Sequence, residues 1–332
     1  VLFRSALSFS NDPSDIDSQI AMEYMYMESY ALAKKYFKRC LMRDPEDYFS
    51  LQQLLHCFDF LGENEQAIQF LTAFLDNNPY CEVAWHSLGR QYMVQNNFQE
   101  ALRAFDFAII SDDTFTGAYF EKARVLEAME QYEKAIENYK ITLTLDDPSA
   151  LVYLHIGRCY EKMRNDQKAE EYYFRATHED PQLGKAWITL ADFYYLRRKH
   201  DKALKYIQKL LSFEPNEPYY WRRYAELNYF ELGNIDEAEY GYRRAVQNGD
   251  YSYATLIEWI DLMLLTEKYQ DALPIISDVV FIYPTELDNY YRIALTYYGL
   301  GDEANAEKYY QLGVAQAPQW QSFFESKFNF KM

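Results

Sequence analysis

The sequence has few of the residues that usually carry enzyme chemistry or hold a disulfide scaffold together. Its 332 residues include 11 glycines, 10 prolines, five histidines and four cysteines. No histidine or cysteine falls in an HExxH or CxxC motif, and the glycines form no GxGxxG, GxxxxGKS/T or GxSxG loop. We therefore expect no catalytic residue, no metal site, no cofactor and no enzymatic activity.

Long apolar runs and excess positive charge are also missing. No apolar run approaches the roughly 18 residues that span a bilayer, so no membrane insertion is expected. The 51 acidic residues outnumber the 33 basic ones, and the resulting formal charge of −18 repels nucleic-acid phosphates. The cysteines lack disulfide-framework spacing, which indicates free thiols in a reducing compartment. We expect a cytoplasmic protein; the start at Val1 rather than methionine leaves a removed signal peptide and a periplasmic location open.

What the chain does contain is a repeated pattern of about 34 residues. Residues 82–113 form two amphipathic segments with apolar side chains three and four positions apart, separated by Asn96 and Asn97. An alanine of the second segment recurs every 34 residues, with a single gap of 35, which predicts nine helix pairs sharing one continuous core. These alanines are Ala33, Ala67, Ala101, Ala135, Ala169, Ala203, Ala238, Ala272 and Ala306.

This pattern resembles the tetratricopeptide repeat. The resemblance covers roughly residues 14–320 and implies an all-α fold, an α-solenoid of tandem helix-turn-helix repeats that forms a right-handed superhelix. It also implies a non-catalytic scaffold in which the first helix of each pair lines a concave, peptide-binding groove. In the third unit the resemblance rests on Trp85, Leu88, Gly89, Tyr92, Ala101, Phe105 and Ala108.

The phase of the repeat divides the chain into three parts. Residues 1–13 fall outside it, and we expect a poorly ordered linker or a remnant of cloning. Residues 321–332 are predicted to form a C-terminal capping helix, whose aromatic side chains offer a homodimer contact as an alternative. The nine repeats between them are expected at 14–47, 48–81, 82–115, 116–149, 150–183, 184–217, 218–252, 253–286 and 287–320.

Three local features of the sequence each predict a detail of the structure. The gap of 35 places one extra residue between Ala225 and Tyr229, which predicts a bulge in that helix. Pro274 falls inside the second helix of repeat eight, which predicts that this helix starts late or bends. A glycine recurs at one turn position, where the chain needs a positive φ or a close approach. These glycines are Gly62, Gly233 and Gly301.

The candidate site is a row of arginines on the expected groove face. Arg90, Arg124 and Arg158 share the ninth position of three consecutive repeats. A guanidinium fork suits carboxylates and carbonyl oxygens, so we predict that the row binds a partner segment with acidic side chains or exposed carbonyls. The groove neighbours expected beside the arginines are His56, His86, Phe120, Glu121, Glu127, His155 and Glu161.

Several alternatives remain open. The arginines could be structural, because Arg124 with Glu127, and Arg158 with Glu161, have the spacing of ion pairs within one helix. The preferred function is a protein–protein interaction scaffold or adaptor. One alternative is a regulatory or targeting module of a larger protein whose N-terminal part is missing. Another is an RNA-binding helical-repeat solenoid, which the charge of −18 disfavours.

Overall fold

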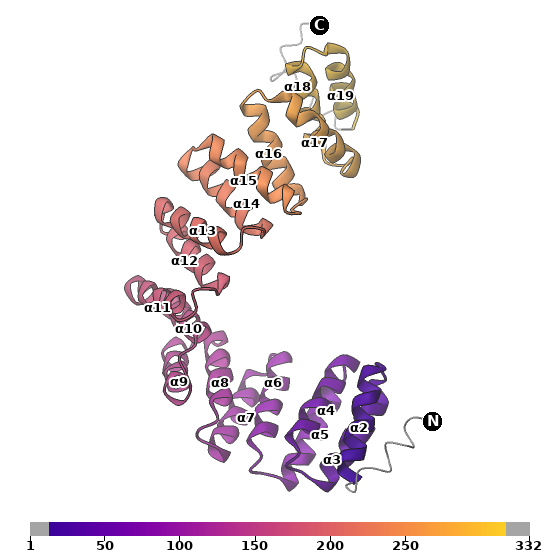
Figure 1. Ribbon diagram of the computed structural model, residues 1–332, viewed down its shortest axis with the longest axis vertical. Helices are drawn as coiled ribbons and strands as arrows, with labels where there is room; N and C mark the ends of the chain where they lie inside the picture. The colour runs from indigo at the N-terminus through magenta and orange to yellow at the C-terminus, as the bar shows by residue number, and fades with distance from the viewer. Residues whose placement is uncertain (1–12, 317–332) are drawn as a thin grey trace. The chain divides into compact units, whose positions relative to one another are not determined.

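The computed structural model describes residues 13–316 and shows an all-α protein (Figure 1). Eighteen α-helices follow one another in this range, without a β-strand. The predicted all-α solenoid of helix-turn-helix units is therefore confirmed for the described residues. The expectations for residues 1–12, for the capping helix at 321–332 and for a dimer contact through it lie outside them.

The chain divides into two compact units, residues 1–180 and 181–332. The expected continuous core shared by all nine pairs stays a prediction. Nothing in the repeat marks the boundary, because Pro181 occupies the same position in its repeat as Pro79 and Pro215. The two units are therefore described separately.

Unit 1 contains five helix pairs, each a first helix (A) and a second helix (B) joined by a short turn (Figure 1). Each helix lies beside the next one in the chain. The pairs are α2 (Pro13–Tyr26) with α3 (Tyr30–Arg43), α4 (Tyr48–Leu61) with α5 (Asn64–Asn77), α6 (Glu82–Val94) with α7 (Phe98–Ser111), α8 (Thr116–Ala128) with α9 (Tyr132–Leu145), and α10 (Ala150–Lys162) with α11 (Asp166–Glu179).

Unit 2 contains four pairs within its described residues, built in the same way. They are α12 (Gly184–Leu196) with α13 (His200–Phe213), α14 (Pro218–Glu226) and its continuation η1 (Leu227–Leu232) with α15 (Ile235–Gln247), α16 (Tyr253–Leu265) with α17 (Tyr269–Ile282), and α18 (Leu287–Gly299) with α19 (Glu303–Gln316).

Small residues set how closely the helices of a pair approach. The recurring alanine of every B helix is completely buried in all nine pairs. On the A helix, Gly89 lies so close to Phe105 of the B helix that an added Cβ would sit 2.5 Å from the ring. Since real Cβ contacts are much longer, the aromatic ring occupies the space that a side chain at Gly89 would need.

An aromatic side chain near the start of several A helices ties that helix to the proline before it. Each indole or phenol donates a hydrogen bond to a proline carbonyl six residues earlier. This bond fixes the entry of the chain into the A helix. The pairs are Trp85 Nε1 to Pro79 (2.8 Å), Trp187 Nε1 to Pro181 (2.9 Å), Trp221 Nε1 to Pro215 (2.7 Å) and Tyr290 Oη to Pro284 (3.1 Å).

The turn between the helices of each pair runs through one residue with a left-handed backbone. Gly62, Gly233 and Gly301 have φ values of 67°, 69° and 75°, which confirms the prediction for these glycines. The other six pairs place a residue with a side chain in the same conformation, at φ between 54° and 59°, and an L-residue is strained there. These residues are Glu28, Asn96, Glu130, Arg164, Arg198 and Glu267.

Replacing Glu130 with glycine is expected to raise the free energy of unfolding by about 0.5 kcal/mol. Left-handed backbone costs an L-residue about 1–2 kcal/mol, and the greater freedom of glycine in the unfolded chain offsets about 0.5–1 kcal/mol of that gain. Urea unfolding measures the change. The reverse substitution, Gly62→Ala, should destabilise by a similar amount, because no atom crowds that site. A lower stability for Glu130→Gly would contradict the strain argument.

The two irregular repeats differ in outcome. The extra residue near Ala225 is accommodated as a π-helix, Leu227–Leu232, so the predicted bulge is confirmed. Pro274 lies inside α17, which begins at Tyr269, three residues before its alanine as in the other B helices, so the late start is wrong. The missing N–H of Pro274 leaves the carbonyl of Gln270 without its helix donor, and Gln270 is exposed to water.

Candidate functional site

A groove of about 510 Å³ lies between the A helices α4 and α6 of unit 1. It contains three of the residues predicted from the sequence, namely His56, His86 and Arg90. One wall comes from α4 and the other from α6, with single contributions from α5 and from the residue before α8. The complete lining is Gln52, Leu55, His56, Asp59, Asn64, Val83, His86, Ser87, Arg90, Gln91, Val94 and Phe115.

Arg90 is a cation of this groove that forms no ion pair with residues 13–316. Its side chain is exposed, and no carboxylate of residues 13–316 lies within 4.0 Å of its guanidinium nitrogens. In a chain with 51 acidic residues, an arginine without an ion-pair partner is available to a ligand.

His86 lies beside Arg90 but is uncharged at neutral pH. The centroid of its ring lies 5.8 Å from that of Phe105 and 5.3 Å from that of Phe115, and the contact with Phe115 is edge-on. Burial, followed by the nearby positive charge of Arg90, lowers the pKa of His86 from its ordinary 6.5 to about 4. This end of the groove is therefore an aromatic, neutral wall.

Gln91 supplies an acceptor that the described chain leaves unused. Its side chain is only 7% exposed, and Nε2 donates a hydrogen bond to Oδ1 of Asp59 at 3.1 Å. The other amide atom, Oε1, is buried and has no hydrogen-bond partner among the described residues. A buried acceptor without a donor costs about 1–3 kcal/mol. A ligand N–H would recover this energy if the side chain turned its oxygen into the groove, since the atom is closed to solvent in this structure.

Lowering the pH from 7 to 5 is expected to destabilise the wild-type chain by about 2 kcal/mol more than a His86→Phe variant. The pKa of His86 is about 4 in the folded state, below the ordinary 6.5. Between these two pH values the imidazole is protonated in the unfolded state but not in the folded state. Stability is therefore lost at about 1.4 kcal/mol per pH unit as the pH falls below 6.5. Urea unfolding at both pH values measures it. Equal pH dependence in the two proteins would show that His86 is not buried in its neutral form.

The other two predicted arginines already have acidic neighbours. Arg124 Nη1 bonds both carboxylate oxygens of Glu121, at 2.8 and 3.1 Å, and not Glu127 as the helix spacing predicted. Arg158 Nη1 reaches 3.5 Å from Oε1 of Glu127 in the preceding pair. Glu127 cannot serve Arg124 because it is turned toward the next A helix, where His155 holds it.

Glu127 is the centre of a polar cluster between α8, α9 and α10. Its Oε2 lies 2.8 Å from His155 Nδ1 and accepts a 2.8 Å hydrogen bond from Tyr139. Phe120, also predicted for the groove, lies edge-on to the rings of Tyr139 and His155. Burial alone would raise the pKa of Glu127, but the bonds from His155 and Tyr139 outweigh it and hold the pKa below its ordinary value. These predicted site residues are therefore part of the packing.

Glu161, at the equivalent position one repeat later, has the equivalent tyrosine partner in its own pair. Its Oε2 accepts a 2.6 Å hydrogen bond from Tyr173 of α11. In each of these two pairs, a glutamate of the A helix thus bonds a tyrosine of the B helix twelve residues later. The spacing of twelve residues between the two side chains is visible in the sequence.

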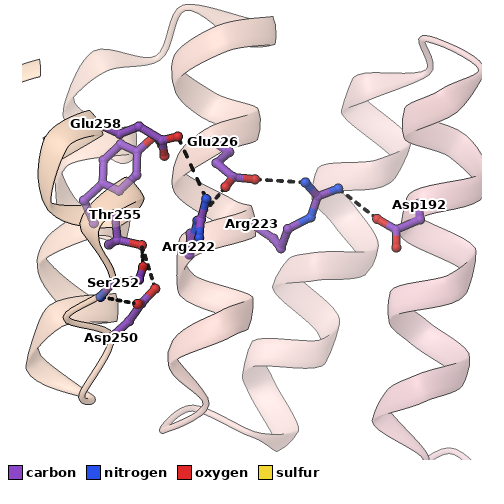
Figure 2. A network of polar contacts seen from close by, with 9 residues as sticks. Asp192, Arg222, Arg223, Glu226, Asp250, Ser252, Thr255 and Glu258 are labelled. Atoms are coloured by element: carbon purple, nitrogen blue, oxygen red, sulfur yellow. Dashed lines mark hydrogen bonds and ion pairs between the residues drawn. The ribbon is translucent and has the colours of Figure 1, made fainter. Parts of the chain in front are cut away.

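In unit 2 the A helices carry an ion-pair network (Figure 2). Arg223 on α14 bridges Asp192 of α12, at 2.8 Å, and Glu226, at 2.9 Å. Arg222 bonds Glu226 at 2.7 Å and lies 3.9 Å from Glu258 of α16. The arginines of this face are therefore already used to link neighbouring A helices.

The structure thus separates the predicted site into two groups. His56, His86 and Arg90 come together in the groove, whereas Phe120, Glu121, Arg124, Glu127, His155, Arg158 and Glu161 take part in ion pairs, hydrogen bonds or ring contacts. Sequence reasoning missed Asp59 and Gln91 on the groove walls. Asp59 follows His56 by three residues, a helix-face spacing that could have pointed to it. Gln91 directly follows Arg90, and adjacent residues of a helix do not share a face, so this spacing carries no such signal.

Comparison with known proteins agrees with the repeat pattern. Tetratricopeptide repeat models match residues 18–47, 120–183, 167–227 and 287–319. The chain belongs to the tetratricopeptide repeat family. No curated protein sequence matches this tetratricopeptide repeat chain.

A solved structure shows the same fold. A tetratricopeptide repeat protein from Parabacteroides merdae is 14% identical with a TM-score of 0.53, over 76% of this chain and 98% of that one. Pseudomonas aeruginosa PilF is 21% identical with a TM-score of 0.48, over 63% of this chain and 94% of that one. Within residues 13–316, no helix is long and apolar enough to cross a membrane, and no group of three His, Cys, Asp or Glu side chains is placed to hold a metal ion.

Proposed function

We propose that this tetratricopeptide repeat protein is a non-catalytic scaffold that binds a peptide segment of a partner protein in the groove between α4 and α6. The observation that carries the proposal is Arg90, an exposed cation without an ion-pair partner in residues 13–316. It stands beside the unused acceptor of Gln91 in a groove of about 510 Å³. Grooves of that size are typical of ligand sites.

The contrast with the other A helices supports this location. Arg124, Arg158 and Arg223 all have carboxylate neighbours within 4.0 Å. A ligand carboxylate would have to compete with those intramolecular contacts, whereas at Arg90 it competes only with water. The peptide site therefore lies at one end of the predicted arginine row rather than along all of it.

A display selection tests the proposal. Random nine-residue peptides are selected on the full chain, and the enriched peptides are then assayed on three proteins: wild type, Arg90→Glu and Arg103→Glu. Arg103 is a suitable control because it lies on α7 outside the groove with its side chain 71% exposed. We expect binding to wild type and Arg103→Glu and loss of binding to Arg90→Glu. Peptides that bind all three proteins equally would place the binding surface elsewhere and refute the proposal.

A further inference from the structure

The walls of the groove are ordered along α6 in a way that selects a kind of peptide. His86, Arg90 and Val94 all line the groove, four residues apart on one face of the helix. With a rise of about 1.5 Å per residue, these side chains start about 6 Å from one another along the helix axis. They therefore present three evenly spaced contact points, with the cation in the middle.

An extended peptide has nearly the same spacing. Alternate residues of a strand point to the same side and lie roughly 6.6 Å apart. Three alternate side chains of a peptide running along α6 thus match the three contact points. The intervening side chains face away from α6.

Each contact point favours one chemistry. His86 and the edge-on ring of Phe115 form an aromatic wall. An apolar side chain is favoured there, because it can be buried without leaving a polar group unbonded. Arg90 offers a carboxylate a guanidinium that pairs with no carboxylate of residues 13–316. Val94 is 65% exposed and would bury its apolar surface under a second apolar side chain.

We propose that the groove binds an extended segment with an acidic residue flanked by apolar residues two positions before and two positions after it. This inference rests on the proposed function and names the ligand class of that site. The buried Oε1 of Gln91 has no donor among the described residues, and a backbone N–H of the peptide would bond it once the side chain turns that oxygen into the groove. Gln52 and Asn64 on the facing wall carry amides that can bond backbone carbonyls or amides.

Three synthetic nine-residue peptides test the spacing. The first has leucine, glutamate and valine at positions three, five and seven, with serine or glycine elsewhere. The second has glutamine in place of the glutamate. The third has the same composition as the first, but with leucine, glutamate and valine adjacent at positions four to six. Each is titrated by fluorescence anisotropy into the full wild-type chain and into Arg90→Gln.

We expect the second and third peptides to bind wild type at least tenfold more weakly than the first, because the second lacks the charge-assisted bond and the third cannot reach all three contact points. Arg90→Gln should bind the first two peptides equally. Equal binding of the first and third peptides that still depends on Arg90 would overturn the spacing and leave the groove as a peptide site. The same holds if none of the three binds while display-selected peptides do and require Arg90. If no peptide, designed or selected, depends on Arg90, both proposals fall.

Discussion

Replacing Arg90 with glutamate is expected to lower the affinity for a groove-bound acidic peptide by a hundredfold or more. The change removes a charge-assisted hydrogen bond, which contributes about 1.5–3 kcal/mol, and puts a like charge against the carboxylate of the peptide. The guanidinium has no carboxylate partner within residues 13–316, so its loss should leave the fold intact. Fluorescence anisotropy gives the affinity, and the melting temperature shows whether the fold is preserved.

The same substitution at Arg124 or Arg158 should change the affinity by less than about threefold. Arg124 is bonded to Glu121, and Arg158 lies near Glu127, so neither contributes its full charge to a ligand. Exposed ion pairs of this kind contribute about 0–1 kcal/mol, so these variants also serve as matched charge-reversal controls. Equal losses of affinity for all three variants would restore the arginine row as one continuous binding site.

The second large effect concerns stability. Gly157→Ala is expected to lower the free energy of unfolding by about 3 kcal/mol, because the new Cβ would lie 2.6 Å from the ring of Tyr173. That ring cannot easily move aside, since it is 1% exposed and its hydroxyl is bonded to Glu161. Urea unfolding followed by circular dichroism measures the loss.

Gly117→Ala is the matched control for this prediction. Gly117 is the second residue of α8, and a Cβ there would make only ordinary contacts, 3.5 Å from Phe115 and 3.6 Å from His86. In a helix, alanine is favoured over glycine by roughly 0.5–1 kcal/mol, so this variant should be slightly more stable than wild type. If both variants were destabilised alike, the close approach of Gly157 to Tyr173 would not be the cause.

Most of the fold could be predicted from the sequence, because it depends on local, repeated features. The buried alanines, the left-handed turn glycines and the extra residue near Ala225 each follow from spacing along the chain. Each of these features depends only on one helix pair and the pairs next to it. The division of the chain after Asp180 has no comparable local signal.

The candidate site could be predicted only in part. Position in the repeat placed Arg90, Arg124 and Arg158 on A helices, but it did not show which of them is free. Arg124 bonds Glu121, whereas Glu127 bonds His155 of the next pair. Which partner each side chain contacts depends on burial and on side-chain rotamers in three dimensions. Ion pairs between repeats, such as Arg223 with Asp192, were missed for the same reason.

A double-mutant cycle between the protein and its ligand tests most directly whether the groove binds an acidic peptide. Arg90→Gln is combined with a glutamate-to-glutamine change in the bound peptide, and the four dissociation constants are measured by titration calorimetry. If the guanidinium binds that carboxylate, the coupling free energy should be about 1.5–3 kcal/mol. The same cycle with Arg124→Gln should give a value close to zero. A coupling near zero at Arg90 would contradict the account.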